Sequence, residues 1–218
     1  MRGKPWLPYV LPFALYLGFL GIQSQFGPDA VVWLYPLKAL VVAVALLALR
    51  KSYVELRPSF SPLAVLTGAV AIVIWVAIDP LYPGLSRLTG GTAPVPFDPG
   101  TLASIPWRWA FIVFRVMGAV LVVPVMEELF WRGFLIRWLV KDDFKTVPIG
   151  TYTGYSFGAT VLLFGAEHEQ WLAGIICGAL YNLLLYRTKN LTDCVVAHAT
   201  SNALLAAWVL VRADWRFW

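Results

Sequence analysis

Two adjacent glutamates and an arginine stand in one of the most apolar stretches of the chain, Pro124 to Trp138. In a helix, Glu128 and Arg132 lie four residues apart and share a face, whereas Glu127 points about 100° away from Glu128. A charged side chain at the centre of a bilayer costs on the order of 2.5–3.5 kcal/mol even on lenient scales. The three charges are therefore expected to be either an ion-paired anchor near an interface or the reactive part of the molecule.

Further polar side chains follow in apolar segments downstream. The chain has only two histidines, His168 and His198, and both lie in or beside apolar runs. Asn202 follows His198 by one helical turn, and Phe164 precedes His168 by the same spacing. Each histidine alone is as readily explained by a hydrogen bond between two spans. Two histidines, a glutamate pair and an amide together favour a functional site.

Side chains of these types can hydrolyse a bond with an activated water molecule. A carboxylate in a pocket of low dielectric gains proton affinity and can act as a general base, and a neutral histidine can share that task or position the water. A second histidine and an amide can stabilise a developing oxyanion. A glutamate with two histidines also matches a catalytic zinc site, but the local HExxH spacing is absent, so a metal is not indicated. No serine or cysteine stands in an obvious nucleophile motif.

The composition predicts an all-α polytopic membrane protein with its site inside the membrane. Of the 218 residues, 60% are hydrophobic and 13% charged, whereas soluble domains have roughly 45–50% and 25%. At about 20 apolar residues per span, a single domain over residues 1–218 would hold about seven or eight transmembrane helices. The long unbroken apolar runs argue against a β-barrel. Cys177 and Cys194 lie in apolar stretches and are expected to be small buried side chains.

The apolar runs predict the helices in chain order, at about residues 9–22, 31–49, 62–78, 154–164, 171–186 and 191–211. Residues 107–140 are too many for one untilted span and contain Pro124, so we expect either a bend there or two helices. Lys38 is expected to snorkel to the lipid headgroups. The segment 79–106, rich in proline and glycine, is expected to be a lid or a surface loop.

The basic residues indicate the topology. The net charge of +5 comes from basic side chains that flank apolar runs and do not cluster on a polar face. This pattern indicates how the chain is oriented in the membrane, and it argues against nucleic-acid binding. The positive-inside rule predicts a cytoplasmic N-terminus, because Arg2 and Lys4 stand there. It also predicts cytoplasmic loops at the basic segments 50–57, 137–145 and 187–190. The first apolar run has no clear cleavage site, so it is expected to be a retained helix.

Three short motifs in order resemble the CAAX-protease and bacteriocin-processing family, the Rce1-like and Abi-like intramembrane proteases. EELFWR resembles EExxxR, FGAEH resembles FxxxH and HATSN resembles HxxxN. The resemblance covers roughly Gly118 to Leu205, inside a motif-bearing part of about 107–211. It implies an endopeptidase that cleaves a membrane-embedded or lipid-anchored substrate, prenylated or CAAX-like, and it favours a bacterial plasma membrane.

The resemblance also implies a role for each motif residue. Glu127 would activate water with His168 as its partner, while His198 and Asn202 would stabilise the transition state. Glu128 would pair with Arg132, the pair that the helical spacing also predicts. The supporting residues would be Glu128, Arg132 and Phe164. Zinc is argued both ways for the family, and its ligands here would be Glu127, His168 and His198.

Two departures from the family pattern matter. Glu167 and Glu169 flank His168, where the family more often has small or apolar residues, and an extra carboxylate there could compete for the proton or hold a metal. The N-terminal half matches no motif, so the resemblance does not extend to substrate selection. Two alternatives stay open: a proton-coupled transporter, although no inverted repeat is evident, and a catalytically inactive scaffold of the same fold.

Overall fold

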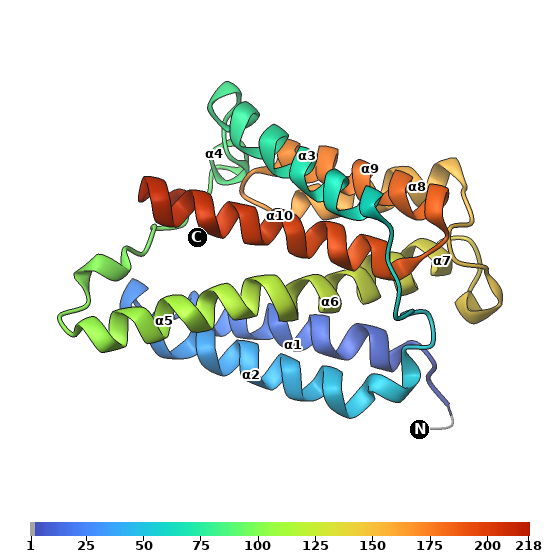
Figure 1. The fold of residues 1–218 in the computed structure, drawn as a ribbon, viewed down its shortest axis with the longest axis horizontal. Coiled ribbons are helices and arrows are strands. Elements are labelled where there is room, and N and C mark those ends of the chain that lie inside the picture. The colour runs from blue at the N-terminus through green and yellow to red at the C-terminus, as the bar shows by residue number, and fades with distance from the viewer. Residues whose placement is uncertain (1–2) are drawn as a thin grey trace.

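The computed structural model describes residues 3–218, so Arg2 lies outside the described residues, and every regular element in this range is a helix. Helix α10 runs through the middle of the bundle, with α3 on one side and the long helix that contains α5 and α6 on the other (Figure 1). The α-helices are α1 Leu7–Gln23, α2 Val31–Leu49, α3 Pro62–Ile78, α4 Leu85–Thr89, α5 Ile105–Met117, α6 Val123–Glu128, α7 Ile136–Trp138, α8 Gly154–Ala166, α9 Trp171–Thr188 and α10 Leu191–Arg212.

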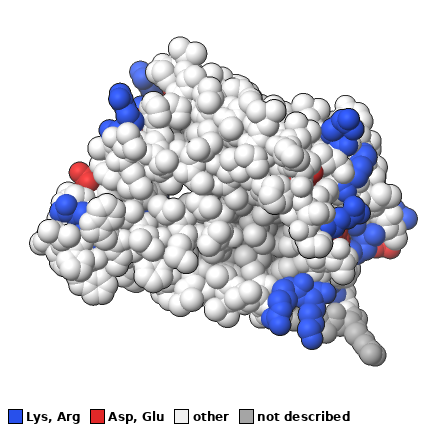
Figure 2. Space-filling view, viewed as in Figure 1, with Lys and Arg blue, Asp and Glu red and all other residues white. Residues whose placement is uncertain are grey.

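Four of the helical segments are long and apolar enough to cross a membrane: Val31–Ser52, Pro62–Leu81, Ile105–Trp138 and Leu191–Arg212. Helices α1 and α8 are apolar but shorter. Figure 2 shows Lys and Arg at the two ends of the molecule, more of them at the end that carries the N-terminus and α7, and an uncharged surface between. The all-helical membrane class is therefore confirmed, whereas the count of seven or eight spans is not.

The long helix between Ile105 and Trp138 is continuous, but two of its segments are π-helical. The first is Gly118–Val122 and the second is Leu129–Leu135. Pro124 stands in the first turn of α6, directly after the first π segment. A proline has no backbone N–H and disrupts a regular helix, and here the expected interruption takes the form of a local change in winding. π segments are frequent at functional sites, and these two flank both glutamates.

A close approach of backbones joins α3 to α10. A Cβ atom placed on Gly68 would overlap the carbonyl oxygen of Ala197 and would lie 2.8 Å from Cβ of Thr200. Small residues allow helices in membranes to pack at such short distances, where dispersion forces are strongest. Since α10 carries His198 and Asn202, this contact fixes one wall of the site.

A buried ionic cluster joins α1, α7 and two loops at the end that carries the N-terminus. Glu55 accepts hydrogen bonds from Tyr9 at 2.6 Å, Arg137 at 2.9 Å and Lys145 at 3.1 Å, and its side chain is 6% exposed. Burial alone would raise the pKa of Glu55, but the three hydrogen bonds outweigh it and lower the pKa below the ordinary value. Arg137, expected in a cytoplasmic loop, is instead a buried member of α7.

Replacing Gly68 with alanine should destabilise the bundle, although alanine is the better helix former. The added methyl group forces α3 away from α10, and overpacking of this kind costs about 1–3 kcal/mol. The matched control is Gly158→Ala on α8, where a new Cβ would have no neighbour within 4 Å. We expect a lower thermal midpoint in detergent for the first variant only, and equal midpoints would contradict the close contact.

The Glu55 cluster should also give the protein an acid-sensitive component of stability. A carboxyl group whose pKa is lowered by folding stabilises the folded state above its unfolded pKa, and this contribution is lost as the pH falls through the folded value. Glu55→Gln should therefore lower the thermal midpoint at pH 7, and its difference from wild type should shrink below about pH 4.5. Asp142→Asn, in an exposed loop, is the control. A pH-independent difference would show that the charge of Glu55 plays no part.

Candidate active site

A cavity of about 410 Å³ lies inside the bundle and receives side chains from both halves of the chain. Glu127 of α6, His168 from the turn after α8, and His198 and Asn202 of α10 all line it. These are the four side chains to which the family resemblance gives catalytic roles, and they come from segments far apart in the sequence. Their roles in a reaction remain predictions, but their convergence is a property of the fold.

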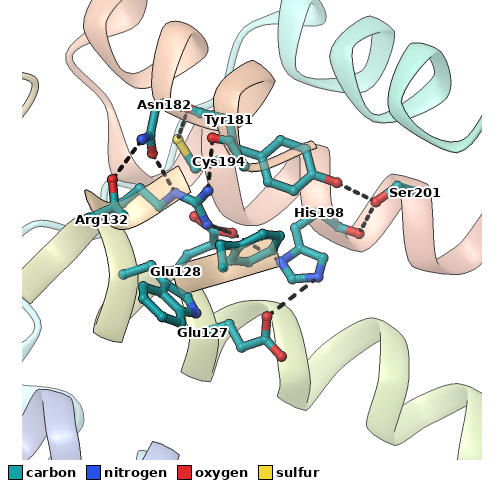
Figure 3. Close-up of polar contacts among 12 residues, drawn as sticks. Glu127, Glu128, Arg132, Tyr181, Asn182, Cys194, His198 and Ser201 are labelled. Carbon is teal, nitrogen blue, oxygen red and sulfur yellow. Dashed lines mark hydrogen bonds and ion pairs between the residues drawn. The ribbon is translucent and has the colours of Figure 1, made fainter. Parts of the chain in front are cut away.

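The ion pair predicted from the helical spacing forms next to His198, which lines the cavity. Nη1 of Arg132 lies 3.1 Å from Oε1 of Glu128, and both side chains are completely buried (Figure 3). Nε of Arg132 donates to Asn182 at 2.9 Å, Nη2 donates to the carbonyl of Gly178, and the guanidinium packs 4.5 Å from the ring centre of Phe164. A buried charge is tolerated when its hydrogen-bonding groups are satisfied in this way.

Asn182 is a site residue that the sequence analysis missed. It is fully buried in α9, and its Nδ2 donates to the hydroxyl of Thr160 on α8 at 2.9 Å. Asn182 thus connects the guanidinium of Arg132 to a third helix. The signal that could have found it is an amide in the middle of the apolar run LYNLLLY, which costs free energy in a membrane unless it has a partner.

Glu128 has a second partner that the sequence did not predict. Nδ1 of His198 lies 3.0 Å from the same Oε1 atom that binds Arg132, and the imidazole stacks on Tyr181 with ring centres 5.4 Å apart. Because a carboxylate can only accept, Nδ1 carries the proton of this hydrogen bond. Nε2 of His198 is left facing Glu127, 4.0 Å from its Oε2 (Figure 3).

Glu127 is the less satisfied of the two carboxylates. It is 7% exposed and accepts no hydrogen bond from the described residues, whereas Glu128 accepts two at Oε1, although Oε2 is unpartnered in both glutamates. A buried carboxylate oxygen without a donor is costly, so Oε2 of Glu127 is available for a water molecule, a substrate or an ion. The assignment of Glu128 to the ion pair and Glu127 to the free position agrees with the sequence prediction.

His168 lies in the turn between α8 and α9 and not on a helix, because α8 ends at Ala166. Its ring is nevertheless fixed: Nδ1 donates to the carbonyl of Phe164 at 2.7 Å, and Trp75 packs edge-on at 5.3 Å. A carbonyl can only accept, so Nδ1 is protonated and the neutral ring has its Nε2 lone pair free.

The two glutamates beside His168 have different environments. The carboxylate of Glu169 accepts from the backbone N–H and the hydroxyl of Ser86, at 3.1 and 2.6 Å, and so ties the 79–106 segment to this turn. Glu167 is exposed and accepts one hydrogen bond, from Nε1 of Trp131 at 3.0 Å. Pro94, Val95 and Phe97 of the tied segment line the cavity, so this segment forms part of its wall.

Asn202 makes one specific contact. Its Nδ2 donates to the carbonyl of Ala119, inside the first π segment, at 2.8 Å. One of the two amide protons is thus used to hold the long helix against α10. The second proton remains for the cavity that Asn202 lines.

The prediction for Lys38 was wrong. Its side chain does not snorkel to a headgroup region but is 2% exposed and lines the cavity. Nζ lies 4.2 Å from the ring centre of Tyr16 and 5.0 Å from that of Tyr35. Snorkelling requires a path along an apolar surface to water, and the two tyrosine rings hold this amine inside the bundle instead.

The side chains that could hold a metal differ from the predicted set. Within the described residues, ligand atoms of Glu127, Glu167 and His168 lie within 4.8 Å of one another. This group contains Glu167 and not the predicted His198, although Nε2 of His198 also lies 4.0 Å from Oε2 of Glu127. Of the two glutamates that flank His168, Glu167 is therefore the one whose carboxylate lies near Glu127.

Residues 107–204 match the family model described as Type II CAAX prenyl endopeptidase Rce1-like. This segment belongs to the Rce1-like family. The match confirms the resemblance that the three motifs indicated, and it covers the whole path from α5 to the middle of α10. Membership implies a membrane protease whose substrate is associated with the membrane. No curated protein and no solved structure matched the chain.

Within the Rce1-like segment, Arg132→Lys should destabilise the protein although it keeps the charge. Lysine cannot reproduce the planar fork that contacts Glu128, Asn182 and Gly178. Removing one partner of a buried ion pair outright costs about 3–5 kcal/mol, so this value is the upper bound for the loss in Arg132→Lys. The control is Arg187→Lys, an exposed arginine at the end of α9. We expect a lower thermal midpoint for the first variant alone. Equal midpoints would mean that the three-way contact of the guanidinium with Glu128, Asn182 and Gly178 contributes nothing.

Proposed function

We propose that this protein is an intramembrane endopeptidase in which Glu127 activates the water that attacks a peptide bond. The observation that carries the proposal is the free Oε2 atom of Glu127, buried in a cavity shared with His168, His198 and Asn202. A carboxylate with this surrounding can take a proton from water as a general base. The Rce1-like segment, which contains all four residues, supports the same reaction class.

His168 and Glu127 would share the attacking water. The Nε2 lone pair of His168 is free because Nδ1 is bound to Phe164, so the water can donate one hydrogen bond to His168 and the other to Glu127. Its oxygen lone pair then points at the carbonyl carbon. Glu127 takes a proton as the carbon–oxygen bond forms, and it returns that proton to the leaving amine as the carbon–nitrogen bond breaks.

His198 would stabilise the oxyanion only in its doubly protonated form. Nδ1 already donates to Glu128, so Nε2 can donate to the substrate oxygen only if it carries a second proton. Glu128 stabilises that imidazolium in the way the buried aspartate of a serine-protease triad does. Asn202 adds the amide proton that Ala119 does not use.

A metal ion is compatible with the same cavity. Glu127 and Glu167 would supply carboxylate oxygens, and His168 would supply Nε2 with its other nitrogen fixed by a carbonyl, the usual arrangement of a metal-binding histidine. Bound there, zinc would supply Lewis acidity to water or to the substrate carbonyl. We assign the activation of water to Glu127 because a carboxylate can act as a general base without a metal ion.

The substrate would be a peptide embedded in the membrane or anchored to it by a lipid, prenylated or CAAX-like in the family manner. Reaching the cavity from the bilayer avoids exposing an apolar substrate to water. The larger number of basic side chains at the end with the N-terminus supports an orientation with this end in the cytoplasm. A bacterial plasma membrane remains the proposed location.

Glu127→Gln should abolish peptide cleavage, with a loss of at least about 10²–10⁴-fold, while leaving the fold intact. The assay uses purified protein in liposomes with a fluorescent farnesylated peptide ending in Cys-Val-Ile-Met, its unprenylated form and an apolar transmembrane peptide, and detects products by mass spectrometry. Asp142→Asn is the matched control on an exposed loop. Cleavage retained by Glu127→Gln would refute the base role, and no cleavage of any peptide by the wild type would count against the peptidase.

Chelation separates the two chemistries. If the carboxylate acts alone, activity after dialysis against 1,10-phenanthroline should stay within about twofold of its starting value, and Glu167→Gln should retain activity. The measurement is the cleavage rate together with the metal content of the purified protein. Loss of activity on chelation that zinc restores, with weaker zinc binding in Glu167→Gln, would assign the reaction to a metal held by the cluster.

A further inference from the structure

Two cations line the cavity with no anionic partner. Lys38 of α2 and Arg115 of α5 both border it, and neither forms an ion pair within the described residues. Lys38 is 2% exposed and Arg115 is half-buried. The buried cations Arg132 and Arg137 differ in this respect, because they pair with Glu128 and Glu55. A charge removed from water is normally paired, so the missing partner of Lys38 and Arg115 calls for an explanation.

Aromatic rings hold the two cations in place. Nζ of Lys38 and the guanidinium carbon of Arg115 lie 5.0 and 4.5 Å from the centre of the same Tyr35 ring. The Tyr35 hydroxyl donates to the carbonyl of Arg115 at 3.1 Å, and Trp218 stacks near that guanidinium at 5.7 Å. Contacts with aromatic faces offset part of the cost of burial, but they use none of the N–H donors.

Two positive charges on one ring repel each other, and an anion bound to both would remove that repulsion while filling their empty donor positions. Lys38 offers three N–H donors and Arg115 five. Hydrogen bonds between charged groups are roughly twice as strong as neutral ones. The arrangement therefore has the chemistry of a preformed site for an oxyanion.

We propose that Lys38 and Arg115 form an anion subsite that binds a carboxylate of the peptide substrate, and that this subsite sets which peptide bond meets Glu127. The identity of the ligand rests on the proposed peptidase function. Lys38, Arg115 and Glu127 line one cavity. Its volume of about 410 Å³ lies near the lower end of ordinary ligand pockets, about 300–1,000 Å³, which suits a short peptide segment better than a two-chain lipid. The carboxylate is either that of the chain end or that of an acidic side chain.

Binding can be tested without turnover. Purified full-length Glu127→Gln in a nonionic detergent is titrated with three acetylated peptides: acetyl-Val-Ile-Leu as the free acid, the uncharged acetyl-Val-Ile-Leu amide, and acetyl-Val-Glu-Leu amide, which has only a side-chain carboxylate. The reporter is tryptophan fluorescence, since Trp75 and Trp218 line the cavity. We expect at least one of the two carboxylate-bearing peptides to bind about tenfold or more tightly than the neutral amide, and the better of the two identifies the source of the carboxylate.

The variants then assign the effect to the two cations. In the Glu127→Gln background, Lys38→Met and Arg115→Gln should each reduce the preference for the carboxylate to within about twofold, and Lys38→Arg should keep most of it. Lys51→Met, an exposed lysine after α2, should change nothing. Thermal midpoints show which variants fold. If Lys38→Met does not fold, the comparison of Lys38→Arg with Arg115→Gln still decides the test.

Equal binding of all three peptides would overturn the proposal, and so would a preference that survives both substitutions. Displacement of the peptides by dioctanoyl phosphatidylglycerol, dependent on Lys38 and absent with dioctanoyl phosphatidylcholine, would assign the subsite to a lipid phosphate and overturn the peptide assignment. The peptidase reaction is tested separately. A carboxylate preference without cleavage by the wild type would refute the peptidase but support the anion subsite. Cleavage without a carboxylate preference would support the peptidase and refute the subsite.

Discussion

A single carboxylate oxygen organises this site. Oε1 of Glu128 accepts from Arg132 at 3.1 Å and from His198 at 3.0 Å, in a position that water does not reach. The low dielectric there strengthens both contacts and makes the loss of either costly. Through Arg132 the same network reaches Asn182 and Thr160, so four segments of the chain are fixed relative to one charge. The position of Glu127, the adjacent residue, follows from that anchoring.

The sequence predicted much of the fold because membrane helices are encoded locally. The bounds expected for α2 and α3 agree with those observed, since prolines, glycines and charges interrupt the apolar runs at those points. The Glu128–Arg132 pair was predictable for the same reason, as both residues stand on one helix. The family motifs likewise needed only order and spacing.

What the sequence could not give are contacts between distant segments. The bond from His198 to Glu128 and the grouping of Glu167 with Glu127 depend on how α6, α8 and α10 pack. Lys38 was misplaced because its partners, Tyr16 and Tyr35, become neighbours of one cavity only in the folded bundle. Much of that cavity wall comes from the N-terminal half of the chain, which carries no motif. The proposed reacting groups therefore come from one half of the sequence, and many of the residues that would surround a ligand come from the other.

The two π segments have a consequence for how such a site can change. Each π segment amounts to an extra residue wound into an α-helix, and the six-residue helix α6 lies between them. Deleting one residue from Gly118–Val122 would turn everything on one side of the deletion by about 100° relative to the other. Glu127 and Glu128 would then face new neighbours although neither had been replaced. Short insertions and deletions in these segments are thus a route by which evolution can redirect the carboxylates while every motif letter stays the same.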